Sequence, residues 1–381
     1  MMKRIALLGA TGSIGRQALD VVRSLPNEFE VVALTAGSNV ELLGTQIREF
    51  RPAMFSFEEN AGGRRKWERL GVDSPEFLPP EEICRHPDVD LVLVATSGKM
   101  GLFPTLSSIR SRKPVALSNK EVLVMAGEIV RSEAAKYETE ILPVDSEHSA
   151  IWQCLRGEEA NTVSRLILTA SGGPFRDYSH AELERVSADE ALCHPTWQMG
   201  RKVTVDSATL MNKGMEAIEA HWLFNVPFED IQVIIHRESI IHSLVEFVDC
   251  SVKAQLSLPD MRLPIQYALS YPARLPNPQI NRLEWSTLDC LSFQSPCMDR
   301  FPCLGLALHA ARLGSTYPAA LSAADEVAVE RFLAGDIGFM DIPRLLENTL
   351  EQHQAVTSLS LDNILNADLW AREYAWNWGL R

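Results

Sequence analysis

The feature that most constrains the fold is a repeated alternation of short apolar runs with helix-like segments over the first 145 residues. The chain opens with the apolar run Ile5–Leu8, followed by Gly9, Gly12 and Gly15 and then by a helical stripe of apolar residues. A continuous apolar run is typical of a strand that is covered on both faces. Glycines at this spacing permit a tight turn, close approach of backbone to a phosphate and close packing of helix on strand. The opening therefore predicts a dinucleotide-binding turn at the edge of a parallel sheet.

Further strand and helix units follow this turn. Strands are predicted at Glu30–Leu34, Asp90–Ala95, Pro114–Leu117 and Glu140–Pro143, and helices at Val40–Phe50 and Lys120–Tyr137. Repeated units of this kind imply an α/β fold with a Rossmann-like, doubly wound parallel sheet, in which ligands bind at the carboxyl ends of the strands.

Composition sets broad limits on the class of protein. A chain of 381 residues with 46% hydrophobic and 23% charged residues is globular and too long for one core. Its net charge of −14 argues against nucleic acid as a partner, and it has no apolar run long enough to span a membrane. The seven cysteines are scattered without a C-x-x-C motif, as expected of reduced thiols in a cytoplasmic protein.

The end of the second strand bears on the choice of cofactor. An NAD-binding protein usually has an acidic residue there for the ribose 2′-hydroxyl. This chain instead has Gly37, Ser38 and Asn39, which favours a 2′-phosphate and hence NADP. Because no Arg or Lys stands at that corner, hydroxyl, amide and backbone N–H groups would hold the phosphate. The alternative is that these residues only form a turn and a helix cap.

The segment ILPVDSEHSAIWQ (141–153) places Asp145 and Glu147 directly after an apolar run. One interpretation is a helix start, with Asp145 or Ser146 as the N-cap and acidic residues facing the helix dipole. The other is a pair of carboxylates that share a cation, since two close carboxylates otherwise repel. Lys120, at another predicted strand end, is either a helix-start cation that the dipole disfavours or a group directed at an anionic ligand.

Two loops of the second half suggest ligand binding. Ser171 lies in LILTASGGPF, where a strand breaks into a Ser-Gly-Gly turn that can bind an anion through its N–H groups. His194, Trp197, Met199 and Gly200 lie in a loop whose aromatic residue is expected to be exposed, which suggests a flap.

A helix with an unusually polar side is predicted after this loop. We expect it to run from Ala208 to Phe224, capped by Asp206 or Ser207. Asn212 and Glu216, four residues apart, share a face, as do Lys213 and Glu216. The alternative is a solvated face with a surface Lys–Glu pair.

Taken together, the polar residues of the two halves are of the kinds that bind a divalent cation and a phosphate group. Hard divalent cations such as Mg²⁺ or Mn²⁺ prefer oxygen ligands, and three carboxylates qualify: Asp145, Glu147 and Glu216. Four further side chains suit a phosphate monoester: Ser171, Ser207, Asn212 and Lys213. With a nicotinamide domain in front, this set predicts a metal-dependent reductase for a small phosphorylated, hydroxylated substrate.

The motifs themselves resemble a known family. GATGSIG, SNKE, PVDSEHSA, SGGPF, HPTWQMG and VDSATLMNKGMEAIEA occur in this order and at this spacing in the 1-deoxy-D-xylulose 5-phosphate reductoisomerases. The likeness extends through HRESIIHSLVEFVDCSVKAQLSLPDMRLPIQYALSYP to Pro272. It implies an NADPH- and metal-dependent oxidoreductase with Mg²⁺, Mn²⁺ or Co²⁺, which converts this sugar phosphate to 2-C-methyl-D-erythritol 4-phosphate. That reaction is the first committed step of the methylerythritol phosphate route to isoprenoids.

The resemblance also implies a role for each candidate residue. The NADPH pyrophosphate would be held by Thr11, Gly12, Ser13 and Ile14, its 2′-phosphoribose by Gly37, Ser38 and Asn39, and the nicotinamide side by Asn119, Glu121 and Gly200. The metal would be held by Asp145, Glu147 and Glu216, and these carboxylates with Lys120 would be catalytic. The substrate would be contacted by Lys120, Ser146, Glu147, Ser171, His194, Ser207, Asn212, Lys213 and Glu216, under a flap that includes Trp197 and Met199. Ser38 departs from the family pattern, because some members carry Lys there, which weakens the electrostatic case for NADPH.

The same sequence features also predict how the chain divides into domains. We expect an NADPH-binding domain at 1–145, a catalytic α+β domain at 146–271, a linker at 272–300 and a helical domain at 301–381. Strands are predicted at Ile231–His236, Ile241–Phe247 and Val252–Leu256, and the family's homodimer would form through them. Helices are predicted at Leu304–Leu313, Ala319–Leu333, Ile342–Gln354 and Leu361–Tyr374.

Two other classes of protein stay open at this point. An NADP-dependent semialdehyde or homoserine-type dehydrogenase also opens with a glycine-rich turn, and the semialdehyde enzymes need a cysteine nucleophile near a histidine. Cys154 lies near His148 but inside a predicted helix. A non-enzymatic NADP-sensing module would not need three converging carboxylates.

Overall fold

The chain forms two compact units, each built from separate segments of the sequence. The computed structural model describes residues 2–58, 61–72, 75–197, 199–356 and 358–379. The first unit comprises Met1–Val122, Val130–Ser149 and Asp260–Asn281, and the second comprises Leu123–Ile129, Ala150–Pro259 and Arg282–Arg381. The finer division at residues 145, 271 and 300 stays a prediction.

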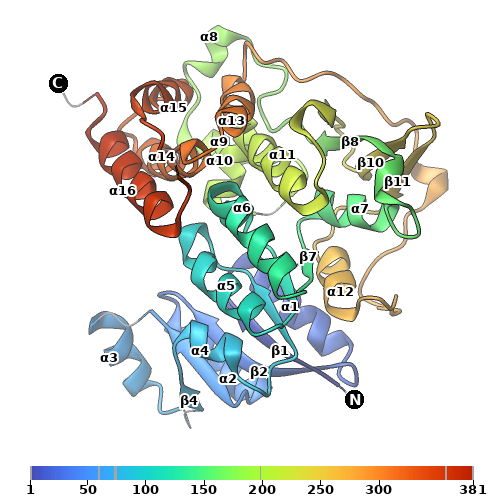
Figure 1. Ribbon diagram of the computed structural model, residues 1–381, viewed down its shortest axis with the longest axis vertical. Helices are drawn as coiled ribbons and strands as arrows, with labels where there is room; N and C mark the ends of the chain where they lie inside the picture. The colour runs from blue at the N-terminus through green and yellow to red at the C-terminus, as the bar shows by residue number, and fades with distance from the viewer. Residues whose placement is uncertain (1, 59–60, 73–74, 198, 357, 380–381) are drawn as a thin grey trace. The chain divides into compact units, whose positions relative to one another are not determined.

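The first unit is organised around a seven-stranded parallel sheet with the order β4-β3-β2-β1-β5-β6-β7 (Figure 1). Its strands are β1 (Lys3–Leu8), β2 (Phe29–Ala36), β3 (Met54–Phe57), β4 (Glu76–Phe77), β5 (Leu91–Val94), β6 (Val115–Leu117) and β7 (Ile141–Pro143). The strand order reverses direction beside β1, at the point where ligands bind in doubly wound sheets. The predicted Rossmann-like sheet is therefore confirmed.

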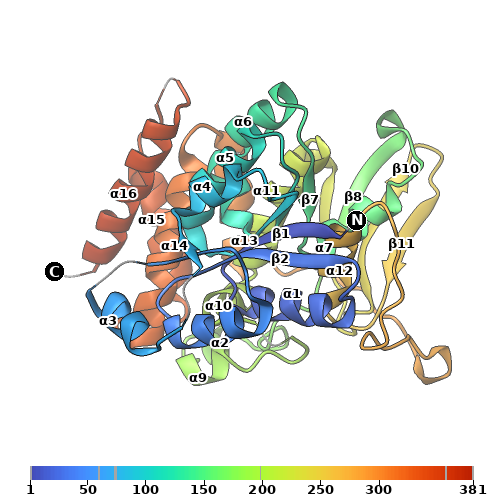
Figure 2. The ribbon, with the colours of Figure 1, turned by 90° about the horizontal axis from the view of Figure 1, so that it is seen from below.

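Helices cover both faces of this sheet. The helices of this unit are α1 (Ser13–Ser24), α2 (Val40–Phe50), α3 (Ala61–Arg69), α4 (Pro80–Arg85), α5 (Leu102–Arg110) and α12 (Arg262–Ser270). Two more helices, α6 (Lys120–Lys136) and α7 (Ser146–Cys154), belong partly to each unit. Figure 2 shows α1 and α2 on one side of β1 and β2, with α4 and α5 on the other side. Both faces of the strands are thus buried, which explains the continuous apolar run in β1.

The second unit contains a mixed four-stranded sheet with the order β11-β10-β8-β9. Its strands are β8 (Val163–Ala170), β9 (Ile231–Ile235), β10 (Ile241–Phe247) and β11 (Val252–Leu256). β8 and β9 are parallel, whereas β10 is antiparallel to both of its neighbours. The three strands predicted here are confirmed, two of them with identical bounds.

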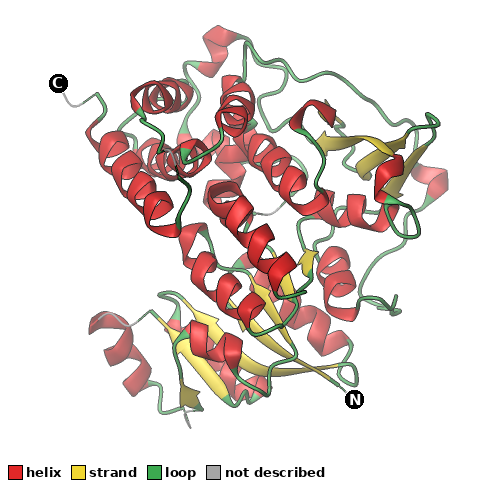
Figure 3. Ribbon diagram, viewed as in Figure 1, coloured by secondary structure: helices red, strands yellow, loops and turns green. Residues whose placement is uncertain are grey.

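The remaining helices belong to the second unit and include the predicted C-terminal group (Figure 3). They are α8 (His180–Leu183), α9 (Ala188–Ala191), α10 (Arg201–Thr209), α11 (Met211–Phe224), α13 (Pro302–Leu313), α14 (Tyr317–Ala334), α15 (Asp341–Gln352) and α16 (Leu361–Asn377). Phe175, Phe332 and Phe339 pack edge to face in the core that these helices share with the sheet. Among the described residues, none of the helices is both long and apolar enough to cross a membrane.

Candidate active site

The glycine turn after β1 has the geometry of a phosphate cradle. Gly9 has a φ of +88°, and a Cβ there would lie 2.4 Å from the carbonyl oxygen of Ala95. A Cβ on Gly15 would lie 2.2 Å from the Gly9 oxygen, so both positions require glycine. Gly12 is exposed and caps α1, whose first-turn N–H groups are suited to a pyrophosphate. The turn therefore fits the dinucleotide that the sequence predicts.

The second cofactor corner follows β2 in the same unit. Gly37, Ser38 and Asn39 are all exposed, and the Asn39 side chain caps α2 by accepting a hydrogen bond from Leu42 N at 3.2 Å. β1 and β2 are adjacent and parallel. Their carboxyl ends lie at one edge of the sheet, where a dinucleotide can contact both turns.

The loop after β6 holds two residues predicted on the nicotinamide side. Asn119 is buried, donates to the Gly98 oxygen at 2.8 Å and accepts from Val122 N at 3.2 Å as the cap of α6. A Cβ on Gly101 would lie 2.6 Å from the Asn119 amide nitrogen. Glu121 is buried in the first turn of α6. Asn119 therefore fixes the loop after β5 to the start of α6, a role with no signal in the sequence.

The two carboxylates that follow β7 lie at a helix start and close to each other. Asp145 precedes α7 and accepts a hydrogen bond from Ser149 N through its backbone oxygen. Carboxylate oxygens of Asp145 and Glu147 also lie within 4.8 Å of each other. Ser146 Oγ donates to Glu147 Oε2 at 2.5 Å. A helix start is thus what brings the two acids together, and the oxygen pair fits a hard divalent cation.

Lys120, the first residue of α6, contacts one of these two carboxylates. Its Nζ lies 2.6 Å from Asp145 Oδ2, and the two side chains are 11% and 20% exposed. Because both are largely withdrawn from water, the lysine charge offsets the cost of keeping Asp145 ionised. The lysine at the helix start is therefore part of the polar cluster and not a solvated surface group.

In the second unit, the Ser-Gly-Gly turn lies against α10. Gly172 and Gly173 have φ values of +82° and +68°, and a Cβ on Gly173 would lie 2.7 Å from the Ser207 oxygen. Gly173 N donates to Ser171 Oγ at 3.2 Å. The turn thus places Ser171 beside the end of α10, where Ser207 is partly exposed.

His194 fixes the direction in which Ser171 can donate. Its Nδ1 accepts hydrogen bonds from Thr196 N at 3.1 Å and Trp197 N at 2.9 Å, so its proton is on Nε2, which lies 2.9 Å from Ser171 Oγ. Burial, and secondarily the charge of Arg176, lowers the pKa of His194 to about 4, which keeps the ring neutral. Ser171 Oγ therefore accepts from both His194 and Gly173, and its own proton is available to an anionic ligand.

The helix predicted from Ala208 to Phe224 is confirmed from Met211 onward, but its predicted start is wrong. The chain forms α10 and α11 instead, separated by Leu210 in the left-handed region with a φ of 61°. Neither Asp206 nor Ser207 is an N-cap, because α10 begins at Arg201 after Gly200. Asp206 Oδ2 pairs with Lys202 at 2.6 Å, and the same amine lies 2.6 Å from Asp325 Oδ2 of α14. No sequence pattern indicates this anchor, because 123 positions separate Lys202 from Asp325.

The polar side of α11 is buried and not solvated. Glu216 is 1% exposed and Lys213 is 5% exposed, with Lys213 Nζ 2.5 Å from Glu216 Oε2. Asn212 donates to the other carboxylate oxygen, Oε1, at 2.5 Å. The surface-pair alternative is therefore wrong, and this cluster places an amine, an amide and a carboxylate in the first turn and a half of a helix.

The loop 194–200 lies partly against the sheet of its own unit. The Trp197 ring is 6.0 Å from the His242 ring on β10, so this tryptophan is half-buried and not exposed as expected. Met199 is also half-buried, Gly200 caps α10 and Gln198 lies outside the described residues. The loop thus has a hydrophobic side that can cover a bound molecule.

Cys154 has none of the properties of a nucleophile. It lies at the end of α7, and burial raises the pKa of its thiol to about 11. A catalytic cysteine needs an accessible, low-pKa thiol. This removes the residue on which the semialdehyde dehydrogenase alternative rested.

Comparison with known proteins agrees with the geometry. Residues 5–127 match the family model described as 1-deoxy-D-xylulose 5-phosphate reductoisomerase. Residues 141–224 and 256–374 match two models that describe C-terminal domains of the same enzyme.

Full-length relatives carry the same name. The 1-deoxy-D-xylulose 5-phosphate reductoisomerase of Shouchella clausii is 51% identical over 371 residues, covering 96% of this chain and 98% of the relative. That of Caldanaerobacter subterraneus is 52% identical and covers 98% of each chain. A solved reductoisomerase from Zymomonas mobilis in complex with NADPH is 37% identical with a TM-score of 0.90, covering 98% of each chain. Another, in complex with NADPH, fosmidomycin and magnesium, is 40% identical with a TM-score of 0.92, covering 98% and 97%. This chain therefore belongs to the 1-deoxy-D-xylulose 5-phosphate reductoisomerase family.

Proposed function

We propose that this chain converts 1-deoxy-D-xylulose 5-phosphate to 2-C-methyl-D-erythritol 4-phosphate with NADPH and a divalent cation. The reaction isomerises the carbon skeleton and reduces the product. The observation that carries the proposal is the Asp145–Glu147 pair beside Lys120 at the end of β7. Family membership and the magnesium and NADPH complexes of solved relatives support it.

The cofactor would occupy the carboxyl ends of the strands in the first unit. Four residues of the first turn would bind its pyrophosphate: Thr11, Gly12, Ser13 and Ile14. The 2′-phosphoribose would contact Gly37, Ser38 and Asn39, and the nicotinamide side would face Asn119, Glu121 and Gly200. Bound NADPH would supply the hydride for the reduction step.

The metal ligands would be Asp145, Glu147 and Glu216. A bound Mg²⁺, Mn²⁺ or Co²⁺ would polarise the substrate carbonyl as a Lewis acid. Oxygen-only ligands and a close carboxylate pair support a cation of this class. We also propose that Glu216 binds the same cation as Asp145 and Glu147.

The substrate phosphate would be held by the second unit. Ser171 would donate a hydrogen bond from its hydroxyl group to the phosphate. His194 and Gly173 leave this O–H free to do so, because their own hydrogen bonds occupy the lone pairs of the Ser171 oxygen. Three more residues would complete this subsite: Ser207, Asn212 and Lys213. Phosphate contacts remote from the reacting carbons would orient the substrate for reaction.

Lys120 would act at the reacting end. Its amine would add positive charge beside the substrate oxygens or move a proton to one of them, while Ser146 and Glu147 would contact the substrate hydroxyls. Trp197 and Met199 would cover the bound substrate and exclude water.

We propose a cytoplasmic homodimer formed through residues 231–256. β11 is the edge of its sheet, and Val252 is 48% exposed there, as is Val248 at 67% in the preceding turn. Exposed apolar residues on an unpaired edge favour pairing with a second copy. All seven cysteines are free thiols, which favours a reducing compartment.

The test is a spectrophotometric assay of the purified chain with NADPH and Mg²⁺ or Mn²⁺. We expect NADPH oxidation that begins only when 1-deoxy-D-xylulose 5-phosphate is added, and that stops when the cation is chelated. Oxidation that is independent of the sugar phosphate, or no oxidation at all, would refute the proposed activity.

A further inference from the structure

The β2–α2 corner lacks a basic residue of its own, although the proposed function requires a 2′-phosphate there. Gly37, Ser38 and Asn39 supply no positive charge, and Glu41 follows in the first turn of α2. A phosphate monoester carries close to two negative charges at neutral pH. Unless another cation compensates the carboxylate of Glu41, that charge would repel the phosphate.

Lys66 of α3 supplies a cation at this corner. Its Nζ lies 3.3 Å from Glu41 Oε1, although 25 positions separate the two residues in the chain. Both side chains are more than half exposed, at 56% and 54%. The pair is therefore weak by itself, and the lysine is free to change partners when a stronger anion arrives. Its flexible stem and three donors allow that change.

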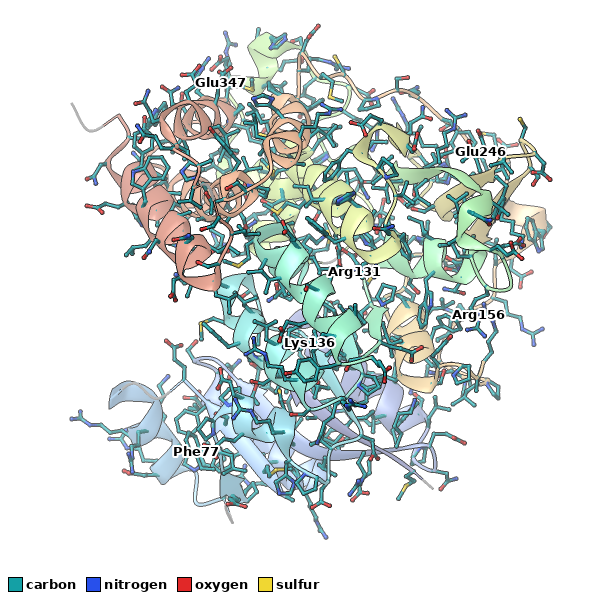
Figure 4. The ribbon with its side chains drawn as sticks, viewed as in Figure 1. Phe77, Arg131, Lys136, Arg156, Glu246 and Glu347 are labelled. Atoms are coloured by element: carbon teal, nitrogen blue, oxygen red, sulfur yellow. The ribbon has the colours of Figure 1, made fainter. Side chains whose placement is uncertain are left out.

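The position of α3 relative to β2 follows from its packing. Phe57, the last residue of β3, is in register with Ala36, the residue directly before the corner. Trp67 of α3 lies against Phe57 with ring centroids 5.6 Å apart and stacks on Phe55 at 4.5 Å. Phe77, labelled in Figure 4, packs edge-on against both phenylalanines. The aromatic cluster thus places α3 at the carboxyl end of β2 and β3.

A second contact fixes α3 along α2. Arg48 donates to the Leu70 oxygen at 2.7 Å, and a Cβ on Gly44 would lie 2.9 Å from a methyl carbon of Leu70. Close packing at this end of α3 leaves Lys66 next to the first turn of α2. The helix that carries it, AGGRRKWER, has four basic residues and one acidic residue in a chain of net charge −14. Lys66 is the member of this basic set that the ion pair places against Glu41, in the first turn of α2.

We propose that Lys66 is a specificity-determining residue that binds the 2′-phosphate of NADPH and so selects NADPH over NADH. The inference rests on the proposed function. Lys66 comes from a different helix and not from the β2–α2 turn, so the turn's own sequence does not reveal it.

The test compares NADPH and NADH affinities of the substrate-free protein, measured by nicotinamide fluorescence. Lys66→Gln should raise the Kd for NADPH about tenfold and leave the Kd for NADH unchanged, because one charge-assisted contact is lost. Arg65→Gln is the matched control. Arg65 is exposed on the same helix and lies two positions before Trp67, on the side opposite that anchor. It should change neither affinity.

A third comparison separates direct contact from neutralisation of Glu41. In a Glu41→Gln background, Lys66→Gln should still weaken NADPH binding about tenfold. Recovery of NADPH affinity in the double variant, equal loss of NADPH and NADH binding, or no loss would overturn the proposal. Turnover of 1-deoxy-D-xylulose 5-phosphate by the same variants reports separately on the proposed function, since selectivity can fail while turnover persists.

Discussion

Each unit supplies a carboxylate that is paired with a lysine. Lys120 lies 2.6 Å from Asp145, and Lys213 lies 2.5 Å from Glu216. All four side chains are largely buried, so each amine stabilises an acid that would otherwise be costly to keep ionised. A metal cation bound by these carboxylates would balance their negative charge in place of the lysines. The two lysine amines could then contact a phosphorylated substrate.

Glu216→Gln tests the role of the buried acid on α11. The amide keeps the volume and can still accept a hydrogen bond from either Asn212 or Lys213 through its one oxygen, but it removes the negative charge and places an NH2 group where the second oxygen accepted. We expect turnover to fall by at least about 100-fold while NADPH affinity stays within about twofold of wild type. Steady-state assays and fluorescence titration measure the two quantities. Equal loss of both would contradict a metal role for Glu216.

His194 gives a prediction about pH. Burial lowers its pKa to about 4, so the unfolded chain, with an ordinary histidine, takes up a proton first as the pH falls. This part of the stability is therefore fully present above about pH 6.5 and is lost as the pH falls toward 4. In an NMR titration of histidine-labelled protein, the His194 signal, assigned with His194→Gln, should not move between about pH 5.5 and 8. A midpoint near 6.5 would show that His194 does not hold Ser171 as described.

At the scale of elements, the turn 171–174 depends on its close approach to α10. Gly173→Ala would introduce a Cβ 2.7 Å from the Ser207 oxygen at a φ of +68°. We expect a cost of about 1–3 kcal/mol, seen as a lower Tm, together with a higher KM for the sugar phosphate. Gly305→Ala is the matched control. A Cβ at Gly305 has no heavy atom within 4 Å outside its own helix backbone, so Tm and KM should hold or improve. Unchanged KM in Gly173→Ala would mean that this turn does not shape the phosphate subsite.

Elements with a strong local pattern could be predicted from the sequence, and α2, β10 and β11 have the predicted bounds. The break between α10 and α11 could not be predicted, because Leu210 adopts a left-handed conformation without glycine or asparagine to signal it. α3 was missed because AGGRRKWER has a single large apolar residue, Trp67, and therefore no helical stripe.

In the candidate site, too, local features could be predicted from the sequence, whereas contacts between distant residues could not. The helix start at Asp145 and the glycine turn are local features, and both could be predicted from the sequence. The contacts Lys120–Asp145 and Lys66–Glu41 join residues 25 positions apart. Such pairs depend on tertiary packing, which no local pattern encodes.

At the scale of the whole molecule, assembly tests the proposed dimer sheet. Val252→Lys places a charge on the exposed edge strand β11, and an edge lysine opposes strand pairing between copies. We expect the wild type to sediment as a dimer and the variant to shift toward monomer. Leu369→Lys, at a 64% exposed position of α16, is the matched control and should stay dimeric. Dissociation of both variants, or of neither, would argue against an interface at β11.

Binding of Mn²⁺ tests most directly whether the acids of the two units form one cation site. EPR titration of the purified chain should find one tight Mn²⁺ site, and Asp145→Asn and Glu216→Gln should each weaken it by about 10- to 100-fold. Glu347→Gln, which removes an exposed carboxylate of α15 and no candidate ligand, is the control and should leave the site intact. If Glu216→Gln bound Mn²⁺ as tightly as the wild type, Glu216 would not be a ligand, and the proposed convergence of carboxylates would be wrong.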